Sequence, residues 1–305
     1  VPYCHLVFTL PHALNGLARC HGRWVYRTLM QCVAATLNEF AANLRWLGAT
    51  GAFTLVLHTW TQDLRRHIHV HALIACGGLD EGARWCAPKR SPTFLFTVHA
   101  LSKVYRGKFL DALRQAIKAG ELPRDLASTE AARRQRLKQL LRHGWVVYAK
   151  KPLADPEVVL DYLSRYTHRV AVSSERIAGI DARGVRLRVR ADDQGGKRTV
   201  FINGPTFIER FMQHVLLPGF KRIRHYGLLS PALKHDRMAQ ARTALGTPHI
   251  DAQACENAAQ FLKRTTGIEV SCCPHCRQGQ WRTVQLLPPL RASSTPPPAA
   301  CRGPP

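Results

Sequence analysis

The sequence predicts an α/β (α+β) protein, because strand-like and helix-like segments follow one another along the chain. Short apolar runs typical of strands occur at His5–Leu10, Phe53–His58 and Ile68–Ile74. Between the first two, Tyr26–Leu47 carries apolar residues at helical spacing. The chain has 305 residues, 46% of them hydrophobic. This size is enough for one large or two modest domains with a real core.

The same patterns predict the remaining elements. We expect Gly77-Gly78 to end the third strand, and Asp155-Pro156-Glu157 to open a helix with an acidic N-cap followed by proline. Further strands are expected at Phe94–Val98, Trp145–Ala149, Ile177–Ile180, Val185–Arg190 and Arg198–Ile202, and further helices at Leu101–Ala119, Thr129–Leu141 and Thr206–Leu217.

The charge of the chain indicates its class of partner. The formal net charge is +24, and an excess of this size points to phosphate backbones or another anionic surface. The sequence holds no apolar run near the roughly 20 residues that span a bilayer and opens on no signal peptide. We therefore expect a cytoplasmic protein that binds nucleic acid and no membrane.

Two histidines in one strand form the first candidate site. Successive side chains of a strand point to opposite faces, so His69 and His71 share a face and Val70 lies on the other. Two neutral imidazoles side by side make half of a metal site and leave positions open for a substrate. The alternative is a strand that carries two histidines by chance.

Two tyrosines form the second candidate site. Tyr162 and Tyr166 are four residues apart on the helix expected after Asp155, so they share a face, with Arg165 and Arg169 close by. A phenol has a pKa of about 10, but neighbouring guanidinium groups and a metal-bound phosphate can make its oxygen a competent nucleophile. The alternative is that both rings are core residues of an amphipathic helix.

Together the two sites predict attack of a tyrosine on a metal-polarised phosphodiester. The product would be a phosphotyrosine and a free hydroxyl. The phosphotyrosine conserves the energy of the bond, so the strand can be rejoined elsewhere, and a second tyrosine would allow a second transfer.

Several motifs, in order along the chain, resemble a known family. They are Val7–His12, Leu57–Gln62, His67–Leu73 followed by Gly77-Gly78-Leu79, Tyr162–Ser173, and the block His214-Val215-Leu216, Pro218-Gly219-Phe220 and Arg222–Gly227. They resemble the HUH-type tyrosine transposases of rolling-circle insertion sequences, the IS-ninety-one kind and its common-region (ISCR) relatives. The resemblance covers about Val1 to Gly246. Relatives usually carry a cysteine-rich zinc module ahead of the position of Val1, and this sequence does not include it.

The resemblance implies a mainly antiparallel HUH-nuclease sheet with flanking helices and a small C-terminal region. It implies His69 and His71 as ligands of Mg²⁺ or Mn²⁺, with Gln62 as the third ligand and His58 or His67 as alternatives. Tyr162 and Tyr166 would be the nucleophiles. The partner would be single-stranded DNA at transposon ends and at the target.

Two weaker signals lie nearer the C-terminus. Lys221, Arg222 and Arg224 could neutralise phosphates while the neighbouring Tyr226 stacks on a base. Cys273 and Cys276 have the spacing of one zinc knuckle, which is half of a structural Zn²⁺ site. The alternatives are a basic surface turn and an unliganded turn.

We therefore expect four regions: a nuclease core with the metal site and tyrosine helix (1–175), a β-hairpin and basic helical DNA-contacting region (176–250), the knuckle region (251–286) and a disordered Pro-rich tail (287–305). The expected function is nicking and rejoining of single-stranded DNA in transposition, a form of DNA recombination. The alternatives are a plasmid replication initiator or relaxase with the same chemistry, and a truncated, inactive DNA-binding remnant.

Overall fold

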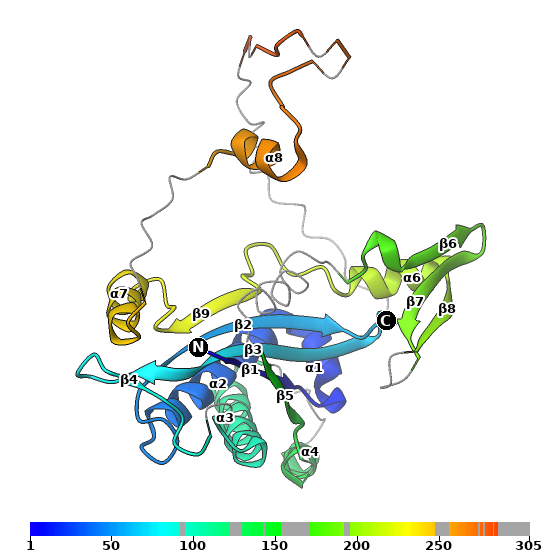
Figure 1. The fold of residues 1–305 in the computed structure, drawn as a ribbon. Coiled ribbons are helices and arrows are strands. Elements are labelled where there is room, and N and C mark those ends of the chain that lie inside the picture. Colours follow the sequence, from blue (N-terminus) through cyan, green and yellow to red (C-terminus); the bar gives the residue numbers. More distant parts are fainter. Residues whose placement is uncertain are drawn as a thin grey trace. The chain divides into compact units, whose positions relative to one another are not determined.

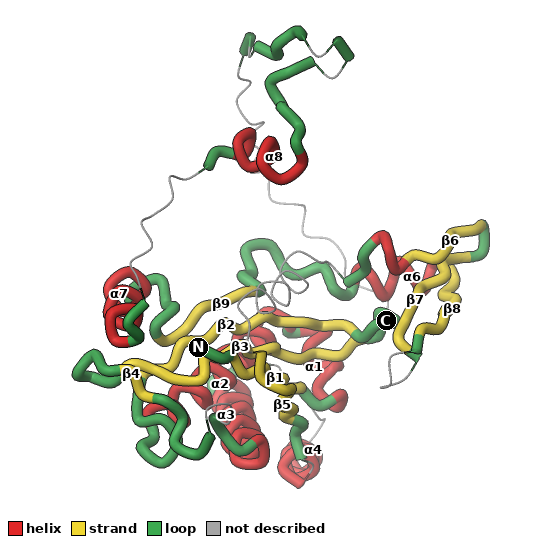
Figure 2. Tube along the Cα trace, viewed as in Figure 1, coloured by secondary structure: helices red, strands yellow, loops and turns green. Residues whose placement is uncertain are grey.

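A computed structural model describes residues 1–91, 95–122, 130–142, 144–153, 171–191, 196–247, 256–273, 275–276, 278–282 and 284–285. The chain divides into two compact units, Val1–His249 and Ile250–Pro305. Among the described residues, the first unit holds two sheets and most of the helices, and the second holds one helix and several turns (Figure 2).

The main sheet of the first unit is antiparallel throughout (Figure 1). The strand order is β5-β1-β3-β2-β9, so β3 lies between β1 and β2. The strands are β1 (Tyr3–Thr9), β2 (Thr50–Trp60), β3 (Arg66–Leu79), β5 (Val147–Leu153) and β9 (Ile223–Gly227), and β4 (Trp85–Cys86) pairs with the end of β3. This topology confirms the expected mixed α/β class with a mainly antiparallel sheet.

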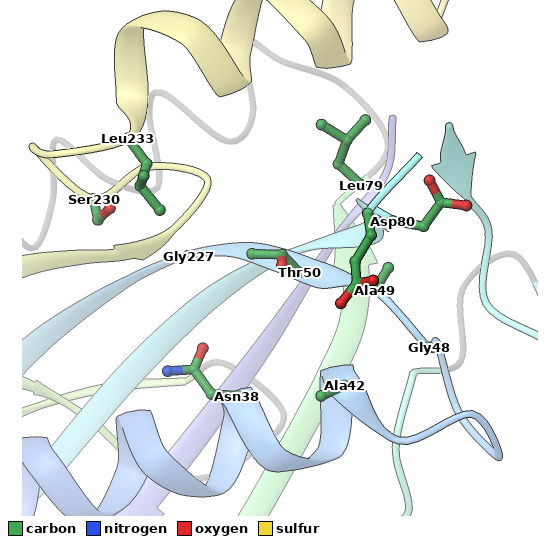
Figure 3. Close-up of a pocket in the computed structure, with 12 residues that line it drawn as sticks. Asn38, Ala42, Gly48, Ala49, Thr50, Leu79, Asp80, Gly227, Ser230 and Leu233 are labelled. Atoms are coloured by element: carbon green, nitrogen blue, oxygen red, sulfur yellow. The ribbon is translucent and has the colours of Figure 1, made fainter. Parts of the chain in front are cut away.

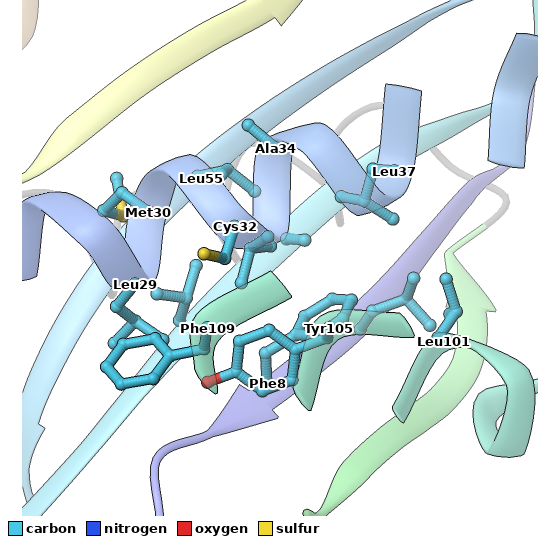
Figure 4. Close-up of a cluster of buried hydrophobic side chains, with 14 of the residues drawn as sticks. Phe8, Leu29, Met30, Cys32, Ala34, Leu37, Leu55, Leu101, Tyr105 and Phe109 are labelled. Atoms are coloured by element: carbon cyan, nitrogen blue, oxygen red, sulfur yellow. The ribbon is translucent and has the colours of Figure 1, made fainter. Parts of the chain in front are cut away.

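One face of this sheet is apolar and packs against helices. Alternate residues of the three central strands are buried there, and Phe8 in β1, Leu55 in β2 and Val70 in β3 are fully buried. The long helices α2 (Gly22–Ala42) and α3 (Val98–Lys118) cover this face (Figure 4). Strand alternation sends the intervening residues, including His69 and His71, to the opposite face.

Helix α2 is shorter at its C-terminal end than its apolar spacing predicts. It ends at Ala42 because Asn43 adopts an extended conformation, and the Asn43 carbonyl then accepts hydrogen bonds from the amides of Trp46 and Leu47. Leu44, an apolar residue within the stretch Tyr26–Leu47 expected to be helical, is 74% exposed. Local turn hydrogen bonds here prevail over the helical pattern.

Two expectations about strands are wrong. Gly77-Gly78 does not end β3, which continues to Leu79; a Cβ on Gly78 would lie 2.5 Å from the Thr50 carbonyl oxygen, so glycine allows close approach of the strands. The strand expected at Phe94–Val98 is absent from its described residues, because Val98 begins α3. The apolar side chains of Leu95 and Phe96, which suggested a strand, are instead buried in the main core.

A second, three-stranded antiparallel sheet lies after residue 170. It consists of β6 (Ile177–Asp181), β7 (Gly184–Arg190) and β8 (Lys197–Asn203), close to the expected positions. Helix α6 (Gly204–Met212) follows and ends before the expected Leu217. This sheet and Leu64, from the β2–β3 turn, share one small core.

The other described elements are mostly short. They are η1 (His12–Leu14), α1 (Asn15–Cys20), α4 (Glu130–Arg142), η3 (Ser174–Arg176), α7 (Lys234–Ala244) and, in the second unit, α8 (Ala258–Thr266). The patterns did not predict α7, α8 or β9. The helix expected after Asp155 and the tail 287–305 lie outside the described residues. Among the described helices, none is long and apolar enough to cross a membrane.

Candidate metal centre

Three histidines meet on the face of the main sheet opposite α2 and α3. His69 and His71 come from the central strand β3, and His58 comes from β2, directly opposite His69 in the register. One nitrogen from each ring lies within 4.8 Å of the other two. The structure therefore brings together three imidazoles that could hold one metal ion.

Hydrogen bonds orient two of these rings. The Nδ1 atom of His69 lies 2.9 Å from the His67 carbonyl oxygen and donates to it. The Nδ1 atom of His71 lies 2.9 Å from Nε2 of His5, a buried residue of β1. Both contacts engage Nδ1, so Nε2 is the nitrogen of His69 and His71 that could serve as a metal ligand.

The surroundings keep these rings neutral. Burial is the main cause and lowers the pKa of His69 to about 4 and that of His5 to about 3. Burial, with the neighbouring histidines, lowers the pKa of His71 further. Neutral imidazole is the form that binds a metal, so near neutral pH the cluster needs no proton loss to accept one.

The expected third ligand, Gln62, is engaged elsewhere. Its side-chain oxygen accepts a 2.6 Å hydrogen bond from the Arg190 amide of β7, and its carbonyl accepts from Arg176. His67, one alternative, lies on the same face of β3 with its ring centre 5.0 Å from that of His69, and its Nδ1 lies 2.9 Å from Nε2 of His12. Of the candidates named from the sequence, His58 is the one with a ring nitrogen within 4.8 Å of nitrogens of both His69 and His71.

Two cations lie next to the cluster. Lys150 of β5 is opposite His5 in the β1–β5 register, and partial burial, followed by the charge of Arg190, lowers its pKa. The guanidinium of Arg222 lies 5.9 Å from the ring centre of Trp60, which stacks on His58. A phosphate bound at the histidines would therefore meet positive charge.

The sequence analysis missed His5 and Lys150. Both lie in strands far from β3 in the chain, and no local motif marks them. Only the strand register places them beside His71, so the useful signal would have been a correct pairing of β1 with β3 and β5.

The other predicted site residues are scattered. Arg224 lies over the Phe220 ring at 5.3 Å, and the carbonyl of Lys221 accepts a hydrogen bond from Arg224. Tyr226, expected to stack on a base, instead stacks on Phe53. Four further predicted residues lie outside the described residues: Tyr162, Tyr166, Arg165 and Arg169.

The knuckle cysteines lie in the second unit. The Cys273 amide donates to the Gly279 carbonyl at 2.7 Å, and the Gly279 amide donates to the Cys276 sulfur at 3.3 Å. Backbone hydrogen bonds to this sulfur lower the pKa of the Cys276 thiol. Such an arrangement suits a thiolate ligand.

An open cavity of about 480 Å³ lies at the opposite end of the β2–β3 pair (Figure 3). Thr50, Leu79, Asp80 and Gly227 are among its lining residues. Thr50 pairs with Leu79 at one end of β2, whereas His58 pairs with His69 near the other. This cavity is therefore not part of the histidine site.

Comparison with known proteins identifies the family. The family described as “Putative transposase” matches residues 51–237, a segment that contains all three clustered histidines. The chain belongs to this transposase family. Within the family match also lie Lys150 and Arg222, whereas His5 precedes it.

Two curated relatives carry the same description of function. “Putative transposase y4qJ” of Sinorhizobium fredii is 40% identical over 295 residues, which cover 93% of this chain and 73% of that protein. The transposase for insertion sequence element IS801 of Pseudomonas savastanoi pv. phaseolicola is 29% identical over 236 residues, which cover 75% of this chain and 54% of that protein.

Solved structures of a relaxase are more distant. The conjugative relaxase TrwC in complex with mutant OriT DNA has a TM-score of 0.32 and 15% identity, over 80% of this chain and 74% of that one. A metal-bound TrwC–DNA structure has the same TM-score and identity, over 80% of this chain and 72% of that one.

Proposed function

We propose that this transposase family member nicks and rejoins single-stranded DNA through a phosphotyrosine, as the HUH-type tyrosine transposases of rolling-circle insertion sequences do. The observation that carries the proposal is the cluster of His58, His69 and His71 on the central strands of an antiparallel sheet. The two transposase relatives support a role in DNA transposition. Its DNA partners would be transposon ends and target sites, met in the cytoplasm.

The donor set suits a divalent transition metal. Three neutral imidazoles favour Mn²⁺ over Mg²⁺, because Mg²⁺ prefers oxygen ligands. When bound, the cation would polarise a phosphodiester and stabilise the charge that develops on it. His58, His69 and His71 would hold it, and His5 would orient His71.

The residues around the cluster have distinct proposed roles. Lys150 and Arg222 would hold the scissile phosphate by its charge. The phenol of Tyr166 or Tyr162 would lose its proton to solvent as its oxygen forms a bond to phosphorus. The bond from phosphorus to the leaving sugar oxygen would break, and that oxygen would take up a proton from solvent as a free hydroxyl. Attack by a hydroxyl on the phosphotyrosine would reverse these changes and rejoin a strand.

A replication initiator or relaxase with the same chemistry is the alternative function, and the transposase relatives favour transposition over it. The test is incubation of the protein with end-labelled single-stranded DNA and Mn²⁺. The proposal expects a labelled protein–DNA adduct that survives denaturation. Absence of any adduct and of any cut strand would favour an inactive DNA-binding remnant.

Metal binding should stabilise the protein through His58 and not through Gln62. At 100 times the dissociation constant, a ligand adds about 2.7 kcal/mol to the free energy of unfolding, which raises the melting temperature by about 5–10 °C for a unit of this size. We expect this Mn²⁺-dependent rise in the wild type and in Gln62→Ala, and its loss in His58→Ala, when thermal unfolding is followed with and without Mn²⁺.

Comparison of His58→Ala with Gln62→Ala tests which of the two side chains is the third metal ligand. Both substitutions truncate one polar side chain near the end of the β2–β3 pair, so Gln62→Ala serves as the matched control. Loss of the rise in Gln62→Ala with retention in His58→Ala would reverse the assignment.

His5 should tune the metal affinity without touching the metal. Its ring contacts Nδ1 of His71, and removal of such an outer partner typically costs 10–100-fold in metal affinity. We expect His5→Phe to weaken Mn²⁺ binding by about that factor in a calorimetric titration, and His5→Asp, which can accept the same hydrogen bond, to recover most of it. An unchanged dissociation constant in His5→Phe would exclude the positioning role.

A further inference from the structure

A second pocket lies on the helix-covered side of the main sheet, where α1, α2 and the start of β3 meet. It has a volume of about 600 Å³ and is lined by residues of all three elements and of the segment 212–217. Every described lining residue belongs to the first unit. None of the pocket's lining residues belongs to the three-histidine cluster or to the DNA-contacting residues expected from the sequence.

The lining is strongly basic. Four arginines line it, Arg19 from α1, Arg23 and Arg27 from α2, and Arg66 from β3, together with His21. No described lining residue is acidic. Arg19 and Arg27 are exposed, and neither is paired with a described residue. Unpaired guanidinium groups in one cavity favour a ligand with several negative charges, and the planar guanidinium matches phosphate oxygens in pairs.

The other two arginines are held in place. A guanidinium nitrogen of Arg23 donates to the Pro218 carbonyl at 3.2 Å. Arg66 is hydrogen-bonded to the buried Tyr26 and contacts the Gln213 side chain. The pocket therefore combines two positioned cations with two that can adjust to a ligand.

One wall of the pocket is apolar although it is exposed. Met212 and Val215 are each 57% exposed, and Leu217 is 43% exposed. Half-buried Trp24 lies among the same lining residues. Apolar and aromatic surface beside arginines suits a nucleobase next to its phosphate, because bases present a flat apolar face in an unpaired strand.

Two chain segments connect residues that line the pocket with residues of the metal centre. Arg66 precedes His69 by three residues in β3, about 10 Å along an extended strand. Gln213 lines the pocket, and its neighbour His214 is hydrogen-bonded to Thr59, which follows His58. A strand bound at the histidines can therefore continue around the end of the sheet into the pocket.

We propose that the arginine pocket formed by Arg19, Arg23, Arg27 and Arg66 binds the single-stranded DNA that flanks the phosphodiester at the metal centre. The inference rests on the proposed function and extends it, since it assigns a binding site for the flank of the substrate. Phosphates contact the arginines, and a base lies against the apolar wall.

The test compares two double variants that remove the same charge. Arg19→Gln/Arg27→Gln alters the pocket, and Arg114→Gln/Lys118→Gln alters two exposed residues of α3 that do not line it. Binding of a fluorescent 20-nucleotide oligo(dT) is titrated from 50 to 300 mM salt, with dTMP and inorganic phosphate as competitors. We expect the pocket variant to bind about tenfold more weakly at 100 mM salt and to lose about 1.4 from the log–log salt slope, since each phosphate contact contributes about 0.7.

The control variant Arg114→Gln/Lys118→Gln should keep the salt slope of the wild type. Both double variants should have the melting temperature of the wild type, because all four substituted residues are exposed. Equal binding by the two variants would overturn the pocket. So would competition by dTMP or phosphate at concentrations close to those of the oligonucleotide, because that result describes a pocket for small anions. Adduct formation with Mn²⁺ is measured on the same proteins: if the wild type binds oligo(dT) but forms no adduct, the proposed chemistry fails while the pocket stands.

Discussion

The His69→Ala/His71→Ala variant will bind single-stranded DNA and fail to cleave it. Both side chains offer a ring nitrogen to the cluster with His58, so the variant should lose the proposed metal and its stabilisation of charge on the phosphate. Several kcal/mol of transition-state stabilisation corresponds to about a 10³-fold loss of cleavage rate. The measurement is the rate of cutting of labelled single-stranded DNA in Mn²⁺, beside its binding constant.

Binding should survive because most affinity for DNA comes from lysine and arginine contacts to phosphate. His235→Ala is the matched control, since the His235 side chain is fully exposed in α7. Metal-dependent cutting that persists in the double variant at the wild-type rate would remove the histidines from the mechanism.

The Tyr162→Phe/Tyr166→Phe variant will fold and bind DNA but form no covalent adduct. Phenylalanine keeps the ring and removes only the oxygen that would attack phosphorus, so the expected loss of adduct is complete. Denaturing electrophoresis of the protein with labelled DNA measures it. The single variants test which tyrosine makes the first cut. We expect Tyr166→Phe to abolish it, because Arg165, His168 and Arg169 surround Tyr166 in the sequence.

Tyr148→Phe is the control for this experiment. Tyr148 is 57% exposed in β5, and its loss of a phenol oxygen should leave the adduct intact. Peptide mapping of the wild-type adduct provides the direct reading. A nucleotide attached to neither Tyr162 nor Tyr166 would refute the tyrosine mechanism.

Local patterns predicted most elements of the fold. The runs around β1, β2 and β3, the helices α3 and α4, and the second sheet all lie close to their expected positions. The predictions failed where tertiary contacts determine the local structure. Leu95 and Phe96 resemble a strand by composition, yet they fill the core ahead of α3, because burial alone does not require strand pairing.

Strand β9 is a second element that local patterns failed to predict. A surface turn was one alternative for the basic residues of 221–226, and it is wrong, because Ile223–Gly227 pairs with β2. A Cβ on Gly227 would lie 1.8 Å from the Gly51 carbonyl oxygen, so this glycine permits the close approach of the two strands. No local pattern predicts which strand an edge strand will join.

By itself the sequence determined that His69 and His71 share one face of a strand, because side-chain alternation is a property of the local backbone. It also determined the basic charge, which any folded form of the chain must carry. Only the tertiary structure decided that His58 joins the pair, that His5 contacts His71, and that arginines from three elements line one pocket. These groups lie far apart in the chain, and strand register and helix packing, which depend on the whole core, bring them within contact distance.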